Sequence, residues 1–143
     1  LITLCLTIWG WSIVSKRDRL AKAYAIHNKR IDSVQKSIDD VVQLAKKYYS
    51  HAGSDLEAVN LEPIITSKLK RLSGYISLII NELDKETDKI GLSDNFIEFK
   101  KAISGGAFNT RSRQKINLDN QVYNDITDTS DELTFALEKH LKI

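Results

Sequence analysis

The first fourteen residues carry no charged side chain, and a basic cluster follows them without a linker. An apolar run of this kind has to leave water, either in a protein core or in a bilayer. Fourteen residues at 1.5 Å each form a helix of roughly 21 Å, whereas about 20 residues are needed to cross a bilayer. We therefore interpret residues 1–15 as the C-terminal part of a longer transmembrane helix.

The residues that flank this run support a membrane position. Indole rings favour the membrane–water interface, and lysine and arginine mark a cytoplasmic flank. This pattern predicts a single-pass protein of the inner membrane, with residues 16–143 in the cytoplasm. The predicted membrane-interface residues are Trp9, Trp11, Lys16, Arg17 and Arg19.

Three other interpretations of the N-terminal run remain open. A cleaved signal peptide would have its basic region before the apolar run, whereas here the cluster follows it, although Ala21-Lys22-Ala23 resembles a cleavage site. A run of this length also suits a buried core helix of a soluble domain. Finally, the topology is reversed if the helical domain is exported.

Small residues line one narrow face of the apolar helix. Thr3, Thr7 and Gly10 follow the spacing i, i+4 and i+7. Small residues at such positions let membrane helices approach closely. These three residues are therefore candidates for packing against a partner helix or a second copy.

Composition limits what the rest of the chain can be. Residues 16–143 are enough for one domain and too few for two. The net charge is only +2, which does not favour nucleic acid as a partner. The single cysteine excludes an intrachain disulfide and a multi-cysteine metal site, and the single proline with few glycines is typical of long helices.

A heptad pattern extends from Leu20 to Tyr48 and predicts a long helix continuous with the apolar run. Its near half could form a seam with a partner chain, and its far half could pack in a bundle. Tyr48 and the adjacent Tyr49 are either core residues or anchors of a docking surface. The candidates for an oligomer seam are Tyr24, His27, Ile31 and Val34.

Three more helices are expected after this first one. Ser54 and Glu57 have the spacing of a capping box in the turn that follows it. Gly74 interrupts the second helix, and close packing of another helix would explain it. The expected ranges are Pro63–Lys89, a short helix over Asp94–Ser104, and Asp119–Lys142. The predicted fold is an all-α, antiparallel up-and-down bundle that extends from the N-terminal transmembrane helix.

The loop from Gly105 to Lys115 is the best candidate for a ligand site. Its arginines, hydroxyl group and free backbone amides suit a phosphate or a carboxylate. It is not a P-loop, because the Gly-Lys-Ser/Thr ending is absent. In the alternative interpretation, Gly105 and Gly106 end a helix, Phe108 enters the core, and the arginines pair with acidic residues. The anion-binding candidates are Arg111, Ser112, Arg113 and Lys115.

No pattern in the sequence predicts catalysis. His27, His51 and His140 are scattered singly, so we expect no metal site and no cofactor. Asp125, Asp128 and Glu132 would share a helix face, but the Glu-x-x-His pairs of diiron bundles are missing. An acidic face in solvent is the simpler interpretation, and we do not expect an enzyme.

These observations favour a membrane-anchored helical-bundle subunit that acts by binding other proteins, either as a homo-oligomer or within a membrane complex. The alternative is a sensor of an anionic small molecule, or of nucleic-acid phosphate, through the loop from Gly105 to Lys115. The topology and the use of lysine, asparagine and isoleucine are typical of a bacterial protein.

Overall fold

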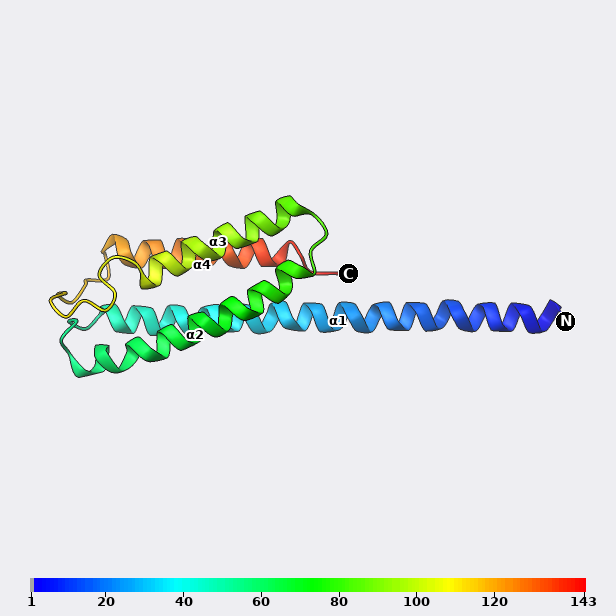
Figure 1. Ribbon diagram of the computed structural model, residues 1–143, viewed down its shortest axis with the longest axis horizontal. Coiled ribbons are helices and arrows are strands. Elements are labelled where there is room, and N and C mark those ends of the chain that lie inside the picture. Colours follow the sequence, from blue (N-terminus) through cyan, green and yellow to red (C-terminus); the bar gives the residue numbers. More distant parts are fainter. Residues whose placement is uncertain (1) are drawn as a thin grey trace.

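Four helices in up-and-down order make up the fold (Figure 1). The structure is a computed structural model that describes residues 2–143, with side chains from Thr7 onward. Within that range no residue forms a strand, so the all-helical prediction is confirmed. The helices are α1 (Ile2–Tyr49), α2 (Leu56–Asn81), α3 (Glu86–Ser104) and α4 (Gln121–Glu138).

The first helix is twice as long as the bundle needs. Its second half packs against α2 and α4, and α3 contacts α2 and α4 on the opposite side. Its first half projects as a stalk, which we define as residues 2–26 (Figure 1). We call the end of the bundle beside the stalk the base, and the opposite end the tip. The C-terminus lies at the base.

The predicted apolar stripes form the core. On α1, burial begins at His27 and continues through Tyr49, whereas Leu20 is exposed and Tyr24 is half-buried. The predicted inward stripe of the second helix is buried from Ile65 through Leu83 in the following turn, except for Ile80, which is half-buried. The later helices contribute Phe96, Phe99, Ile103, Tyr123, Ile126, Leu133 and Leu137, while Ile97 and Leu141 are exposed.

The boundary between the second and third helices was predicted wrongly. The structure ends α2 at Asn81 and begins α3 at Glu86, so α3 has 19 residues and is not short. Leu83 is buried in the turn, and the side chain of Glu82 bonds to α1. These two contacts fix the chain reversal before Gly91, which therefore lies inside α3.

The start of α2 also differs from the prediction. The helix begins at Leu56, and Pro63 lies inside it instead of in its first turn. The predicted capping box does not form, because the N-cap residue is Asp55 and its side chain makes no cap bond. Instead, the Asp55 carboxylate accepts a hydrogen bond of 3.0 Å from the N–H of Ala52, which tightens the preceding turn.

Two further expectations are not met. No neighbouring atom lies within 4 Å of a Cβ built on Gly74, so close helix packing does not explain this glycine. The membrane span is likewise not supported. Across the described residues, the structure contains no helical segment that combines the length and the apolar character needed to cross a membrane.

We expect replacement by alanine to have opposite effects on stability at Gly53 and at Gly74. A Cβ on Gly53 would lie 1.9 Å from the carbonyl oxygen of Thr110, so Gly53→Ala has to displace backbone. We expect it to lower the free energy of unfolding by about 2–3 kcal/mol. Gly74→Ala meets no atom and removes a helix-interior glycine, so we expect a gain of about 1 kcal/mol. Urea denaturation of both variants tests the signs, and equal effects would contradict the placement of Gly53.

Candidate functional site

The stalk exposes apolar side chains that no residue of the described part of the chain covers. Every side chain from Thr7 to Ala23 is exposed to solvent. The exposed fraction reaches 70% for Trp9 and 83% for Trp11. The predicted interface cations Lys16, Arg17 and Arg19 follow on the same exposed helix, where Arg19 bonds to Ser15.

The structure describes only part of the predicted small-residue face. Thr7 is exposed, and a Cβ on Gly10 would meet no atom within 4 Å. The Thr3 side chain lies outside the described side chains. Helix packing at this face therefore stays a prediction.

The residues proposed for an oligomer seam are used inside the chain itself. Ile31 and Val34 are fully buried in the bundle core, and His27 is 4% exposed. Tyr24 lies at the edge, where the ammonium group of Lys142 is 5.6 Å from its ring centroid. The C-terminal tail lies along α1 as far as Tyr24, so the bundle extends one helical turn from His27 toward the N-terminus. In this fold the seam faces inward, toward α2 and α4.

His27 joins three segments at the base of the bundle. Its Nδ1 lies 2.7 Å from Oε2 of Glu82, and its Nε2 lies 2.9 Å from the backbone carbonyl of His140. Both partners are acceptors, so a doubly protonated ring satisfies both bonds, whereas a neutral ring can donate only one. Arg30 donates to the other oxygen of Glu82. We call these residues, with Asn28, the base clasp.

The base clasp also holds the C-terminal tail by its backbone. The side-chain amide of Asn28 donates to the Lys142 carbonyl at 2.7 Å and accepts from the Lys142 N–H at 2.9 Å. This pair of bonds repeats the geometry of a backbone ladder. The tail is therefore fixed to α1 at the point where the stalk leaves the bundle.

Charge in the base clasp is stabilised by its neighbours. The hydrogen bond from His27, followed by that from Arg30, lowers the pKa of the Glu82 carboxyl below its ordinary value, against the opposing effect of partial burial. A carboxyl with a lowered folded-state pKa stabilises the fold above its ordinary pKa. That stabilisation is lost as the pH falls through the lowered value.

We expect His27→Ala to lower the free energy of unfolding by about 2–3 kcal/mol, because it removes a buried ring and two hydrogen bonds. The loss of stability on acidification below about pH 4.5 should become smaller in this variant, since Glu82 loses its main partner. His51→Ala is the matched control, because His51 lies near the surface beside Asp55 and Glu57, at 3.7 and 3.4 Å. Denaturation curves from pH 3 to 7 would contradict the clasp if both variants behaved alike.

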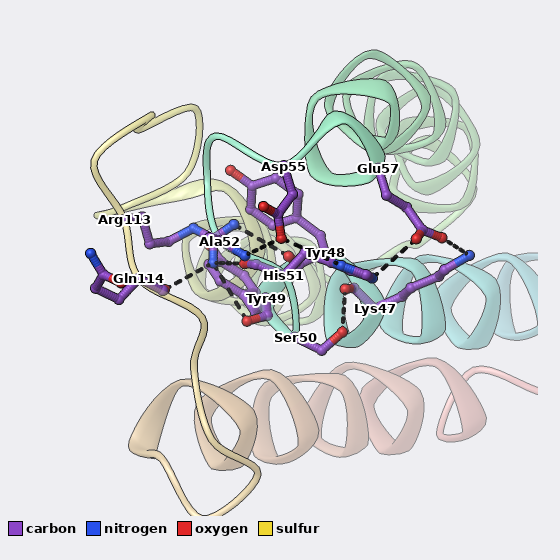
Figure 2. Close-up of polar contacts among 10 residues, drawn as sticks. All are labelled: Lys47, Tyr48, Tyr49, Ser50, His51, Ala52, Asp55, Glu57, Arg113 and Gln114. Carbon is purple, nitrogen blue, oxygen red and sulfur yellow. Dashed lines mark hydrogen bonds and ion pairs between the residues drawn. The ribbon is translucent and has the colours of Figure 1, made fainter.

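At the tip, the loop from Gly105 to Lys115 folds back over the end of α1 (Figure 2). Arg113 is 7% exposed, and its guanidinium donates to the backbone carbonyls of His51 at 2.7 Å and of Tyr48 at 3.2 Å. The guanidinium carbon lies 4.4 Å from the ring centroid of Tyr48 and 5.1 Å from that of Tyr49. Because the last carbonyls of a helix lack helical donors, Arg113 acts as a C-terminal cap of α1.

Both tyrosines at the tip are core residues. Tyr48 is fully buried and Tyr49 is 2% exposed, so neither ring anchors a docking surface in this fold. The Tyr49 hydroxyl donates to the Ile103 carbonyl at 2.8 Å. Burial, with a contribution from the neighbouring Tyr48, raises the pKa of Tyr49 to about 12.

Arg111 forms a bidentate ion pair with Glu62. Its Nη1 and Nη2 lie 2.5 and 2.9 Å from the two carboxylate oxygens, and the Tyr48 hydroxyl donates to the same carboxylate. The hydrogen bond from Arg111 holds the Glu62 pKa below its ordinary value, against the opposing effect of burial. Asn109, with a φ of 60°, turns the loop so that its N–H reaches the Tyr48 hydroxyl at 3.0 Å.

The four anion-binding candidates therefore lie in different surroundings. Ser112 and Lys115 are exposed, and neither side chain has a hydrogen bond or ion pair with another described residue. Arg113 is committed to backbone carbonyls, and Arg111 to Glu62. Anion binding by the loop stays a prediction, and the structure adds a role for both arginines in holding the tip together.

Glu62 and Glu82 are the residues that the sequence analysis missed. Glu62 is buried three residues before Ile65, so it occupies the apolar stripe of α2, whereas Glu82 is the exposed C-cap residue of that helix. A carboxylate on such a stripe requires a cation or several donors. That signal could have led to Arg111 as the partner of Glu62.

A comparison with known protein families, curated protein sequences and solved structures finds no match to this chain.

The two loop arginines should differ in their effect on stability. We expect Arg113→Ala to lower the free energy of unfolding by about 3 kcal/mol, because helix carbonyls lose their donor in a buried site. Arg111→Ala should cost less, because that side chain is half exposed and its ion pair is screened by solvent. Lys115→Ala, in the same loop, should leave stability unchanged. Thermal unfolding of the three variants tests this order, and a neutral Arg113→Ala would rule out the capping role.

Proposed function

We propose that this chain is a membrane-anchored interaction subunit, in which the stalk enters a bilayer and the helical bundle binds partner proteins. The observation that carries this proposal is the distribution of exposed apolar residues around the stalk. At 100° per residue, the five large side chains are spread around the whole helix and leave no polar face. They are Ile8, Trp9, Trp11, Ile13 and Val14.

A bilayer explains this distribution better than a single protein partner does. A partner helix covers one side of the stalk, whereas lipid surrounds it. Full burial of one such side chain contributes about 1.5–3 kcal/mol, so the five together give a strong driving force for insertion. Contiguous exposed apolar surface of this kind is rare on monomeric soluble proteins.

The cations of the stalk would set the distance between the bundle and the membrane surface. The cations Lys16, Arg17 and Arg19 suit an anionic cytoplasmic membrane surface, which favours an inner-membrane protein with the bundle in the cytoplasm. From Lys16 to His27 the helix rises by about 16 Å. The bundle would therefore stand clear of the lipid headgroups, with its sides open to partners.

Self-association or assembly into a membrane complex is part of the same proposal. The exposed Thr7 and Gly10 leave room for close approach of another helix inside the bilayer. An accessory subunit needs no reaction chemistry of its own, and we propose binding rather than catalysis as the activity.

Tryptophan fluorescence tests the proposal directly, because Trp9 and Trp11 are the only two tryptophans of the chain. We expect vesicles that contain anionic lipid to shift the emission to the blue, and brominated acyl chains to quench it, because both indoles would lie at the interface. The matched variant carries Ile8→Asp and Ile13→Asp in the stalk and leaves the bundle intact. It should neither shift nor float with vesicles.

Unchanged wild-type emission in the presence of vesicles would exclude membrane insertion. The cytoplasmic orientation is tested separately by Ser54→Cys in a Cys5→Ser background, because Ser54 lies in the exposed turn at the tip. We expect no reaction with a membrane-impermeant thiol reagent in intact cells. Labelling at this position would show that the bundle lies outside the cytoplasm.

A further inference from the structure

A groove between α1 and α2 near the base collects positive charge on rigid helices. Its walls carry Lys29, Arg30 and Ser33 from α1, and Arg71 and Tyr75 from α2. We propose that this groove binds a phosphate monoester with an apolar or aromatic group. Apart from Ile26, the last residue of the stalk, the site is separate from the stalk and from the loop between Gly105 and Lys115.

Two of the three cations in the groove are free to bind a ligand. The side chains of Lys29 and Arg71 are exposed and have no hydrogen bond or ion pair with any other described residue. Arg30 donates through Nη1 to Glu82, and its side chain keeps an exposed fraction of 28%. A guanidinium carries five N–H donors, so Arg30 retains donors for a second acceptor.

None of the residues that line the groove is acidic, and Glu82, which lies outside the lining, offsets only the charge of Arg30. Residues 63–81 of α2 include Lys68, Lys70 and Arg71 and no aspartate or glutamate. On α1, the nearest carboxylate in sequence, Asp32, pairs with Lys36 at 3.0 Å. An excess of cations in a partly enclosed groove concentrates anions, because field lines are focused between low-dielectric walls.

The groove also offers apolar contact beside the charges. The Tyr75 ring is 40% exposed and Ile26 is 61% exposed, and both line the groove. Gly74, beside Tyr75, leaves open space where any other residue would place a side chain. An anion with an aromatic or apolar group can therefore place its charge on the cations and its hydrophobic part against Tyr75 and Ile26.

Size and charge favour a phosphate monoester over a simple carboxylate. The groove volume is about 380 Å³, within the range of small-molecule sites. A phosphate monoester carries up to two negative charges and several acceptor oxygens, which can engage Lys29 and Arg71 together. The hydroxyl groups of Ser33 and Ser37 already donate to helix carbonyls at 2.9 and 3.0 Å, so they are available only as acceptors.

Another pocket that contains two cations is a weaker candidate. It lies at the tip and includes Lys70 and Arg111. Glu62 binds Arg111 through both carboxylate oxygens and lies in the same pocket, so one of the two positive charges is neutralised. The groove at the base has two unpaired cations, and its third keeps free donors.

The phosphate could belong to a soluble molecule or to a lipid headgroup. If the stalk is anchored as proposed, the ten residues from Arg19 to Lys29 raise the groove by about 15 Å above the interface. The headgroup layer is only about 5–8 Å thick on each side of the hydrocarbon core. We therefore commit to a soluble phosphate monoester, and vesicles of phosphatidic acid in phosphatidylcholine serve as the lipid arm of the test.

The experiment is calorimetric titration of the full chain in neutral detergent with phenyl phosphate and with inorganic phosphate. We expect phenyl phosphate to bind with higher affinity, and Arg71→Ala or Lys29→Ala to weaken binding about ten- to hundredfold. Tyr75→Ala should remove the preference for phenyl phosphate, and Tyr75→Phe should keep it. Lys101→Ala is the matched control. It removes one positive charge, as the groove variants do, but Lys101 lies on the distant α3, where it pairs with Glu98.

Circular dichroism should show that all these variants remain folded, because none of the substituted side chains is buried. The proposal is overturned if phenyl phosphate does not bind, or if Lys101→Ala weakens binding as much as Arg71→Ala, since binding would then follow net charge alone. Binding only to the vesicles, and equally by Arg71→Ala, would also overturn it and would place phosphate recognition at the stalk cations.

Discussion

Burial of one face of α1, from His27 to Tyr49, is the contact on which the rest of the structure depends. This face packs against both α2 and α4, and it provides a large part of the core. Isolated helices gain little stability from their own backbone hydrogen bonds, because nucleation is costly. The packed half of α1 supplies that nucleus, and the stalk continues it. A projecting helix of this length is thus a consequence of the bundle.

Buried side chains that form hydrogen bonds close both ends of the bundle on α1. At the tip, Arg113 caps the last carbonyls of α1, and at the base His27 bonds to Glu82 and to the carbonyl of His140. In each case the bonds join segments that lie far apart in sequence. Buried donors of this kind are strongly destabilising when their acceptors are lost. The two ends therefore restrict how α2, α4 and the connecting loop can be arranged around α1.

Periodicity made the helical core predictable, and the chain reversals were much less so. The apolar stripe of α2, from Ile65 to Leu83, could be identified because spacing alone fixes which face is buried. The turn after Asn81 carries no glycine or proline, so the helix was predicted to continue to Lys89, just before Gly91. That turn depends on Glu82 bonding to α1, which is a tertiary contact. The same holds for the loop, where the pairing of an arginine with an acidic residue was one interpretation and Arg111 confirms it, but spacing could not identify Glu62 or the capping of α1 by Arg113.

Arg30 links the groove to the base clasp. Its guanidinium lines the groove and also bonds to Glu82, whose other oxygen is held by His27. An anion that draws Arg30 away from Glu82 leaves that carboxylate more dependent on its hydrogen bond with His27. Because the coupling between two sites is reciprocal, a change in the base clasp would in turn change the affinity of the groove for the anion. His27 also bonds to the carbonyl of His140 in the C-terminal tail. A ligand in the groove would therefore also affect the contacts at the point where the stalk leaves the bundle.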